Sequence, residues 1–244
     1  VTALVCTIDG ESTTMGGSGT SWTSTLTLDG DETPGNTAFS CASFIDAAGN
    51  AGVTDTSATS GAVNVDFVVP TLGIAMASNN ADTSKAKSGD NIVLTITASE
   101  AVTALVCTID GEATTMGGSG TGWTSTLTLS GDETEGAATF SCASFKDATG
   151  NVGVTDTTAT SGSVTIDLTA PSITNVVPAC GTHVNAAEDD SNCNVVVTTA
   201  NAADGSTVTV TINNVAATST TTGNSATVAI LAATLQGLTT GNTY

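Results

Sequence analysis

The sequence predicts an all-β fold built from tandem domains, and three observations support this prediction. Threonine, serine and aliphatic residues alternate along most of the 244-residue chain, which favours strands with two unlike faces. Turn-forming residues recur about every 8 to 12 positions, and no segment shows helical periodicity. The segment that begins at Val1 recurs without gaps from Val102, with about three-quarters of roughly 70 positions identical. A repeat of this size indicates a string of similar domains.

Residues 70–170 hold the complete form of the repeat, and its first half predicts two strands. Aliphatic residues alternate over 72–76 and again over 92–97, and each pattern predicts a strand. The polar stretch 78–89 between them is expected to be a loop. Glu100 is expected in a short connection to the next strand.

The second half of the repeat predicts further short strands separated by turns. Strands are expected at 105–109, 112–117, 123–129, 140–142 and 164–167. Asp110-Gly111 is a strong signal for a two-residue hairpin turn. The glycine-rich stretches after Met15 and Met116 are expected to be hairpin turns, and the side chains of Trp22 and Trp123 are expected in the core.

About seven strands in roughly 100 residues are typical of an immunoglobulin-like β-sandwich. The sequence therefore predicts tandem immunoglobulin-like β-sandwich domains in an extended string. The expected domains are 1–69, 70–170 and a divergent domain at 171–244. The first lacks a counterpart of 70–101 and is expected to be truncated at its N-terminal side; the third is expected to be truncated at its C-terminal side. We expect neighbouring sequence or neighbouring chains to cover the open sheet edges.

The charge of the chain excludes several classes of partner. Twenty-three acidic residues against three lysines and no arginine give a formal net charge of -20. Such a chain repels nucleic acid and anionic lipid. No run of about 18 apolar residues is present, so no membrane insertion is expected. A solvated acidic surface and the binding of divalent cations both remain open for the carboxylates.

Residues 70–170 resemble the immunoglobulin-like repeats of giant bacterial and microalgal extracellular surface proteins of the adhesin type. The matching phrases are KSGDNIVLT (87–95), ASEA (98–101), GSGTGWT (118–124), DATGN (147–151) and IDLTAP (166–171). The third segment is similar to the repeats of biofilm-type adhesins, through VNAAE (184–188), DGSTVTV (204–210) and AATLQ (232–236). The resemblance implies the sandwich fold and a location outside the cell or at its surface.

The six cysteines predict disulfides, because the cysteine positions respect the repeat and no CxxC zinc motif occurs. In a sandwich of this kind, the two cysteines of each repeat lie on neighbouring strands of one sheet. The expected pairs are Cys6–Cys41, Cys107–Cys142 and, by remainder, Cys180–Cys193. Buried free thiols are the alternative. Disulfides would indicate an oxidising, extracellular compartment.

Several oxygen-bearing side chains are expected to meet where one domain follows another, and they suggest bound Ca²⁺. The sandwich topology brings Asp66 at the exit of the first domain towards Glu100, Asp147 and Asn151 of the second. Asp167 would take the place of Asp66 at the next junction. Calcium prefers such oxygen ligands. The alternative is that Asp147 and Asn151 only cap their own turn, without metal.

These features predict a structural protein and not an enzyme, since His183 is the single histidine and no catalytic constellation is evident. The expected function is a rigid extracellular shaft or surface filament whose partners are copies of itself or neighbouring immunoglobulin-like domains. A stalk of a large cell-surface adhesin is the alternative, and a carbohydrate-binding accessory module is a remote one. No Asn-x-Ser/Thr sequon occurs, whereas O-glycans on the threonine- and serine-rich segments remain open.

Overall fold

The computed structural model describes residues 1–181, 183 and 190–238, and its secondary structure is all-β, with 50% strand and 2% helix. The chain separates into two compact units, Val1–Asp167 and Leu168–Tyr244, so the first unit holds both copies of the repeat. Among the described residues, no helix is long and apolar enough to cross a membrane.

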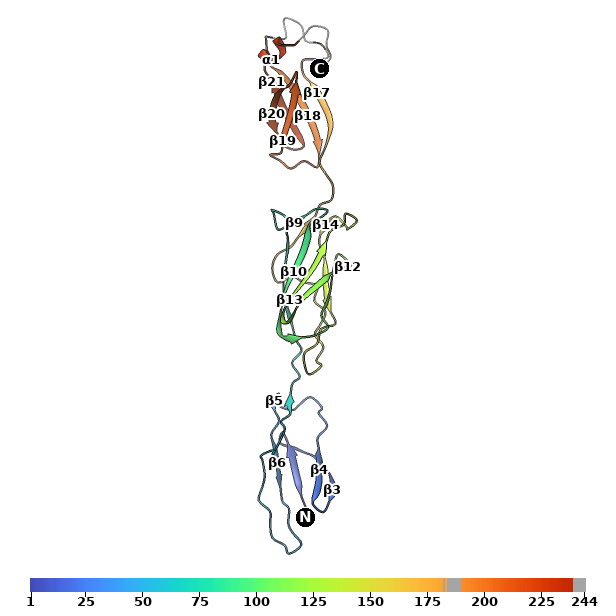
Figure 1. Ribbon diagram of the computed structural model, residues 1–244, viewed down its shortest axis with the longest axis vertical. Helices are drawn as coiled ribbons and strands as arrows, with labels where there is room; N and C mark the ends of the chain where they lie inside the picture. Colours follow the sequence, from blue (N-terminus) through green and yellow to red (C-terminus); the bar gives the residue numbers. More distant parts are fainter. Residues whose placement is uncertain (182, 184–189, 239–244) are drawn as a thin grey trace. The chain divides into compact units, whose positions relative to one another are not determined.

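A three-stranded antiparallel sheet forms one part of the second repeat. It consists of β8 (Leu72–Ser78), β10 (Asn91–Val102) and β13 (Thr115–Thr128), with β10 in the centre. Figure 1 shows β10 and β13 side by side. Ile92, Leu94 and Ile96 of β10 are 0%, 0% and 1% exposed, so the alternating aliphatic side chains face the core as the sequence pattern predicts.

A second sheet of this repeat contains β11 (Val106–Ile109), β12 (Glu112–Ala113) and β15 (Phe140–Ala143). Ile109 lies opposite Glu112, and Asp110 and Gly111 between them have φ values of 50° and 83°. Positive φ at both central residues is what a type I′ turn requires. The predicted Asp-Gly hairpin is therefore confirmed.

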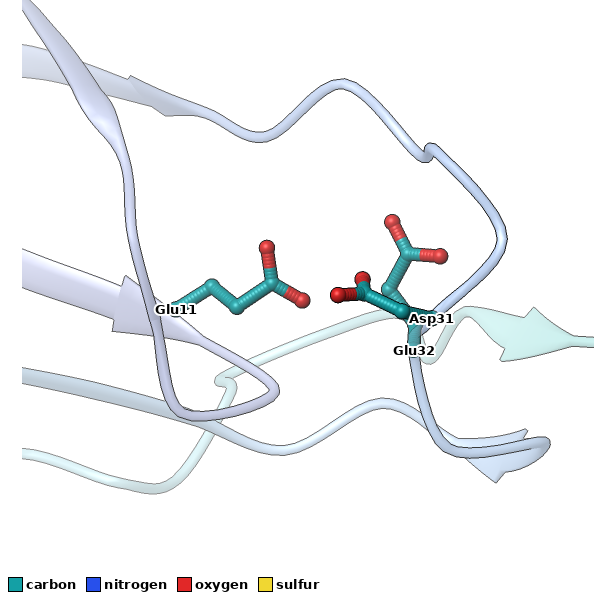
Figure 2. A group of neighbouring side chains, drawn as sticks. All are labelled: Glu11, Asp31 and Glu32. Carbon is teal, nitrogen blue, oxygen red and sulfur yellow. The ribbon is translucent and has the colours of Figure 1, made fainter.

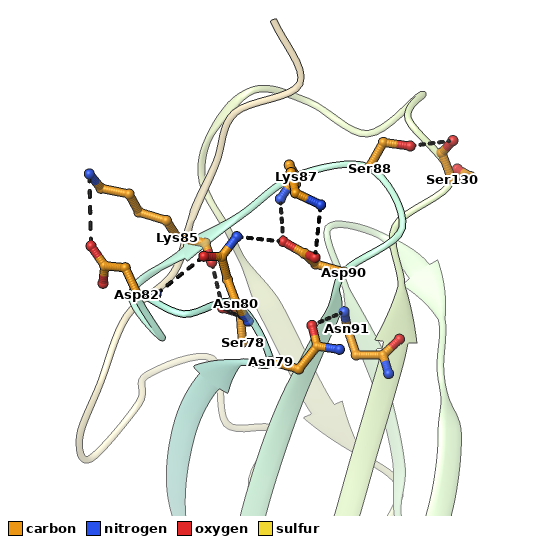
Figure 3. A network of polar contacts seen from close by, with 10 residues as sticks. All are labelled: Ser78, Asn79, Asn80, Asp82, Lys85, Lys87, Ser88, Asp90, Asn91 and Ser130. Atoms are coloured by element: carbon orange, nitrogen blue, oxygen red, sulfur yellow. Dashed lines mark hydrogen bonds and ion pairs between the residues drawn. The ribbon is translucent and has the colours of Figure 1, made fainter. Parts of the chain in front are cut away.

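From the sequence, the polar stretch 78–89 was expected to be a loop, but it also contains a short strand. It contains β9 (Lys85–Ala86), which runs parallel to β16 (Thr165–Ile166); β16 also pairs with β14 (Gly136–Ala137). A two-residue strand is too short to show alternation, which is why the sequence pattern does not reveal it. Side-chain hydrogen bonds hold this stretch, including one from Asn80 Nδ2 to Asp90 Oδ2 at 2.8 Å (Figure 3).

The first repeat forms a reduced version of the same arrangement. Its strands are β1 (Val5–Ile8), β2 (Glu11–Ser12), β3 (Thr14–Ser18), β4 (Ser21–Thr25), β5 (Gly35–Asn36), β6 (Phe39–Ala42) and β7 (Asn64–Val65). β2–β1–β6 corresponds to β12–β11–β15, whereas β3 and β4 form only a two-stranded hairpin. The difference arises because β8 and β9 lie within residues 70–101, and β10 ends one residue beyond them. Residues 70–101 have no counterpart within 1–69.

The tryptophans do not lie in the core, contrary to the expectation from the sequence. Trp22 and Trp123 are each only partly buried. The indole N–H of Trp123 donates to the carbonyl oxygen of Gly120 at 3.0 Å, and that of Trp22 donates to Gly19 O at 3.2 Å. Each indole N–H thus bonds to a backbone carbonyl three residues earlier in its own glycine-rich segment.

The second unit has its own small core. β17 (Ser172–Pro178), β18 (Cys193–Ala200) and β21 (Ser225–Ile230) form a sheet, and β19 (Thr207–Ile212) pairs with β20 (Val215–Thr220). Its buried cluster includes Val195, Val197, Val208, Val228 and Ile230. The motif at 184–188 lies outside the described residues.

One short helix, α1 (Ala232–Gln236), contradicts the expectation that no segment is helical. Alanine, leucine and glutamine are good helix formers, and Leu235 is only 5% exposed. A helix of five residues spans less than two turns, so it leaves no periodicity in the sequence.

Candidate metal centre

Three carboxylates from distant parts of the first unit meet. Asp66 follows β7, Glu100 lies in β10, and Asp147 follows β15. One oxygen atom of each lies within 4.8 Å of the others. Glu100 was expected in a connection between strands, but β10 continues to Val102 through an irregularity after Thr97. This irregularity lies in the part of β10 that carries Glu100, and bulges of this kind re-aim side chains.

Asp147 is the buried member of the group and organises a tight loop. It is 3% exposed, and its Oδ1 accepts hydrogen bonds from the backbone N–H groups of Thr149, Gly150 and Asn151 at 2.9, 2.6 and 2.9 Å. Asp46 of the first repeat makes a similar loop, with bonds from Ala48 N–H and Asn50 N–H at 2.9 and 2.8 Å. The loop therefore forms with or without neighbouring carboxylates, and turn capping accounts for this part of the geometry.

Asn151 joins the loop of the second repeat to the segment that leaves the first. Its side-chain Nδ2 donates to the backbone carbonyl of Asp66 at 3.0 Å and to Asp147 Oδ2 at 2.7 Å. In this orientation Asn151 presents its amide nitrogen to the acidic group. A half-turn of the amide would present Oδ1 in its place, which is the atom that a metal ion would bind.

The surroundings of the group shift the pKa of two of its members in opposite directions. The pKa of Glu100 is raised, first by loss of hydration and then by the charges of Asp147 and Asp66. Burial also acts to raise the pKa of Asp147, but hydrogen bonds from Asn151, Thr149 and Gly150 outweigh this effect and lower it. Lys85 and Lys87 pair with Asp82 and Asp90, outside this group.

The residues fit a hard divalent cation. Ca²⁺ binds six to eight oxygens at about 2.3–2.6 Å, so two of its ligand atoms lie at most about 5 Å apart. The oxygens of the group, which lie within 4.8 Å of one another, are compatible with that spacing. Calcium prefers carboxylate and carbonyl oxygens as ligands, whereas softer metals do not share this preference.

The fifth predicted ligand, Asp167, is not part of this group. Its backbone N–H donates to the carbonyl oxygen of Ala86 at 2.9 Å, which continues the pairing of β16 with β9. Among the described residues, Asp167 belongs to neither group of three carboxylates. Its role as a ligand at a further junction stays a prediction.

A second carboxylate group, absent from the sequence analysis, consists of Glu11, Asp31 and Glu32 (Figure 2). The pKa of Glu11 is raised, first by loss of hydration and then by Asp31 and Glu32. The phrase Gly-Asp-Glu at 30–32, which recurs at 131–133, is the signal that could have revealed the loop.

This second group has a sufficient structural explanation. Glu32 is 4% exposed and accepts the backbone N–H groups of Asp29 and Gly30, both at 3.0 Å. Glu133 accepts the N–H groups of Ser130 and Gly131 at 2.6 and 2.9 Å in the same way. The glutamate therefore holds its own loop in both repeats, and we assign it that role.

All six cysteines are paired, so the alternative of free thiols does not apply. The disulfides are Cys6–Cys41, Cys107–Cys142 and Cys180–Cys193, the three pairs expected from the sequence. In each repeat the two cysteines lie directly opposite each other on neighbouring strands.

Comparison with known proteins gives little further guidance. No known protein family matches the chain, and no curated protein is similar to it. One similar solved structure comes from work on host cell surface retention of a 1.5-MDa bacterial ice-binding adhesin. It is 17% identical with a TM-score of 0.47, and the match covers 95% of this chain and 76% of that chain. A likeness of this size does not define the function of the present chain.

Proposed function

We propose that this chain is a structural segment of an extracellular surface protein, in which tandem immunoglobulin-like β-sandwich domains form a rigid shaft or filament. Calcium, bound by Asp66, Glu100 and Asp147, stiffens the connection between the first and second repeats. The observation that carries the proposal is the meeting of these three carboxylates, because Asp66 belongs to the segment leaving one repeat and the other two belong to the next.

The covalent structure supports the extracellular part of the proposal. Each repeat and the third segment has its own disulfide, and no described cysteine is free. Disulfides persist in oxidising compartments, and they keep each domain closed when the chain is pulled. The low lysine content and the net charge of -20 suit a soluble surface in salt water.

The electrostatics supports the role of calcium. Without a cation, three anionic groups lie together, and the pKa of Glu100 is raised first by loss of hydration and then by the charges of Asp147 and Asp66. A bound Ca²⁺ would convert this repulsion into shared coordination and would couple the segment after β7 to the loop after β15.

The second candidate function is the stalk of a large cell-surface adhesin. The edge of β4 offers a way to distinguish a stalk from a filament. Among the described residues, β4 pairs only with β3. A filament would use such an edge between chains, whereas a stalk would carry its domains in single file and leave chains apart. Sedimentation of the chain over a range of concentrations distinguishes the two.

Calcium titration of the whole chain tests the proposal. Isothermal titration of chelator-treated protein should show one site, and Asp66→Asn should weaken it by about tenfold or more, since a charged ligand is lost. Asp46→Asn is the matched control, because Asp46 forms the same loop as Asp147 but belongs to neither group of three carboxylates among the described residues. Equal binding by the two variants, or none by the parent chain, would refute the calcium part.

A further inference from the structure

The strand that ends the second repeat runs parallel to the strands that begin it. β16 pairs with β9 in parallel, with Thr165 opposite Lys85. A further parallel bridge joins Ser161 to Ala75 of β8. Every other pairing between the strands of this repeat is antiparallel. The first and last strands of the repeat therefore share one direction.

Backbone hydrogen bonds join β16 to β9. The N–H groups of Thr165 and Asp167 donate to the carbonyl oxygens of Ser84 and Ala86 at 2.8 and 2.9 Å. β16 is thus bonded to the first half of the repeat up to the residue at which the chain leaves it.

Residues 160–162 make a second set of contacts, with β8. Thr160 N–H donates to Ile74 O at 2.7 Å, and Thr160 Oγ1 accepts the N–H of Ile74 at 3.1 Å. Met76 N–H donates to Ser161 O at 3.0 Å. Gly162, with φ of 74°, lies so close to β8 that a Cβ would collide with the carbonyl oxygen of Met76. The glycine therefore permits this approach.

The loop between β8 and β10 fixes β9 in its place. Ser78 Oγ donates to the carbonyl oxygen of Lys85, and Asn80 Nδ2 donates to Asp90 Oδ2 at 2.8 Å (Figure 3). The backbone N–H of Lys87 donates to the same carboxylate oxygen at 3.0 Å. A force on β9 is therefore passed on to β8 and β10.

Tension along the chain loads the parallel bonds in shear. The chain enters the repeat before β8 and leaves it after β16. Because these segments run in one direction, tension on the two ends pulls them in opposite directions along their common axis. The bonds between them are then stretched together, whereas strands that are peeled apart from one end lose their bonds one at a time.

We propose that the bonds from residues 160–167 to residues 74–86 form a clamp through which the second repeat resists tension along the chain. The rate of unfolding under force is set by the barrier at which the clamp breaks. This inference goes beyond the proposed function, because it concerns tension and not bending, and it does not depend on calcium.

The disulfide of this repeat determines how much chain is released once the clamp breaks. Cys107 and Cys142 are 35 residues apart, and the chain between them carries no tension while the disulfide is intact. Replacing both cysteines by alanine should lengthen the unfolding step by about 120 Å, at about 3.3–3.6 Å per residue. This change identifies the step that belongs to the second repeat, since the Cys6–Cys41 disulfide is unaltered.

Stretching single molecules of the whole chain by its two ends tests the proposal. At constant force, Thr160→Val should raise the unfolding rate of the second repeat by about fivefold or more, because the loaded bond from Ile74 N–H is lost. Thr165→Pro should have the same effect, since it removes the N–H that donates to Ser84. Thr160 is exposed, so its variant keeps the test valid if Thr165→Pro does not fold.

Thr114→Val is the matched control. Thr114 Oγ1 donates to Cys107 O at 2.8 Å and accepts a bond from Ser125 Oγ at 2.6 Å, so its loss should lower the stability measured in urea. Thr114 lies between the two cysteines and off the path of tension, so its unfolding rate under force should stay within about twofold of the parent.

Three outcomes would overturn the proposal. The first is an unchanged unfolding rate under force in the folded clamp variants. The second is an equal increase in rate for Thr114→Val and Thr160→Val. The third is disappearance of the difference between these two variants in excess chelator, which would attribute the resistance to a metal ion. Failure of the calcium titration leaves the expected rates unchanged.

Discussion

At the scale of single residues, Glu100 and Asp147 respond to pH in opposite senses although they lie in one group. The pKa of Glu100 is raised in the folded chain, so the folded state holds this proton more tightly than the unfolded state. The pKa of Asp147 is lowered, so its contribution to stability is present above the ordinary aspartate pKa and is lost as pH falls.

The first prediction concerns Glu100 in calcium-free buffer. As pH rises from the ordinary glutamate pKa of about 4.3 through the higher folded value, the free energy of unfolding should fall, because Glu100 must ionise where it has lost hydration and lies beside Asp147 and Asp66. Glu100→Gln should remove this decrease. Urea denaturation at several pH values measures it, and an unchanged pH profile in the variant would contradict the assignment.

Gly153 supports a second prediction at this scale. A Cβ on Gly153 would fall within the ring of Phe145, which is 1% exposed and has no room to move. Gly153→Ala should therefore destabilise the second repeat by about 1–3 kcal/mol.

Gly52→Ala is the matched control for that substitution. Gly52 lies against Phe44 in the same way, but Phe44 is only partly buried and its ring can shift. Its effect on the unfolding free energy should be clearly smaller. Equal losses in the two variants would show that backbone conformation, and not ring packing, requires the glycine.

At the scale of strands, the disulfide of each repeat joins two residues that already face each other. The N–H and C=O groups of Cys41 bond to Asp55 at 2.9 and 3.0 Å, so Cys6 and Cys41 form a non-hydrogen-bonded pair. In such pairs the side chains approach closely, and here the Cα atoms are 4.1 Å apart. The strand register thus places the two sulfur atoms before they bond.

The third prediction follows from the 35-residue separation of the paired cysteines. Replacing Cys107 and Cys142 together by alanine should lower the free energy of unfolding by about 3–4 kcal/mol, on the basis of chain entropy. Denaturation in urea under non-reducing conditions measures the loss. A decrease in the free energy of unfolding below about 1 kcal/mol would mean that the conformations of the unfolded chain are already restricted without the disulfide.

Most strands could be predicted from the sequence, and those that could not have a common physical reason. Alternating aliphatic residues gave β8 and β10, and Asp110-Gly111 gave the hairpin between β11 and β12. β9 and α1 are too short for a period to appear, and tertiary contacts decide them. The place of Glu100 within β10 depends on an irregularity of pairing that sequence patterns do not encode.

The candidate site was predictable only in part, because its members meet through topology. Asp147 and Asn151 carry a local turn signal, and Asp66 and Glu100 were inferred from the expected order of strands. The group of Glu11, Asp31 and Glu32 was missed, since Glu11 lies in β2 and the other two lie in a distant loop. Nothing in the local sequence of β2 indicates this approach.

At the scale of the whole molecule, tandem domains make a spacer only if the connections between them resist bending. Disulfides act within domains and leave these connections untouched, because no pair joins one domain to the next. At the exit of the first repeat, Asn151 bonds to the backbone of Asp66, and the carboxylates of Asp66, Glu100 and Asp147 lie together. Stiffness of the chain should therefore depend on what neutralises them.

The fourth prediction is that calcium restricts the range of conformations of the chain. In small-angle scattering, excess chelator should shift the distribution of interatomic distances towards shorter values. Without calcium the carboxylates repel one another, and nothing holds the two repeats in one arrangement. Asp66→Asn should resemble the chelated chain even with calcium present, whereas Asp46→Asn should resemble the parent. If a chain that binds calcium in the titration shows unchanged scattering on chelation, the ion has only a local role and does not stiffen the chain.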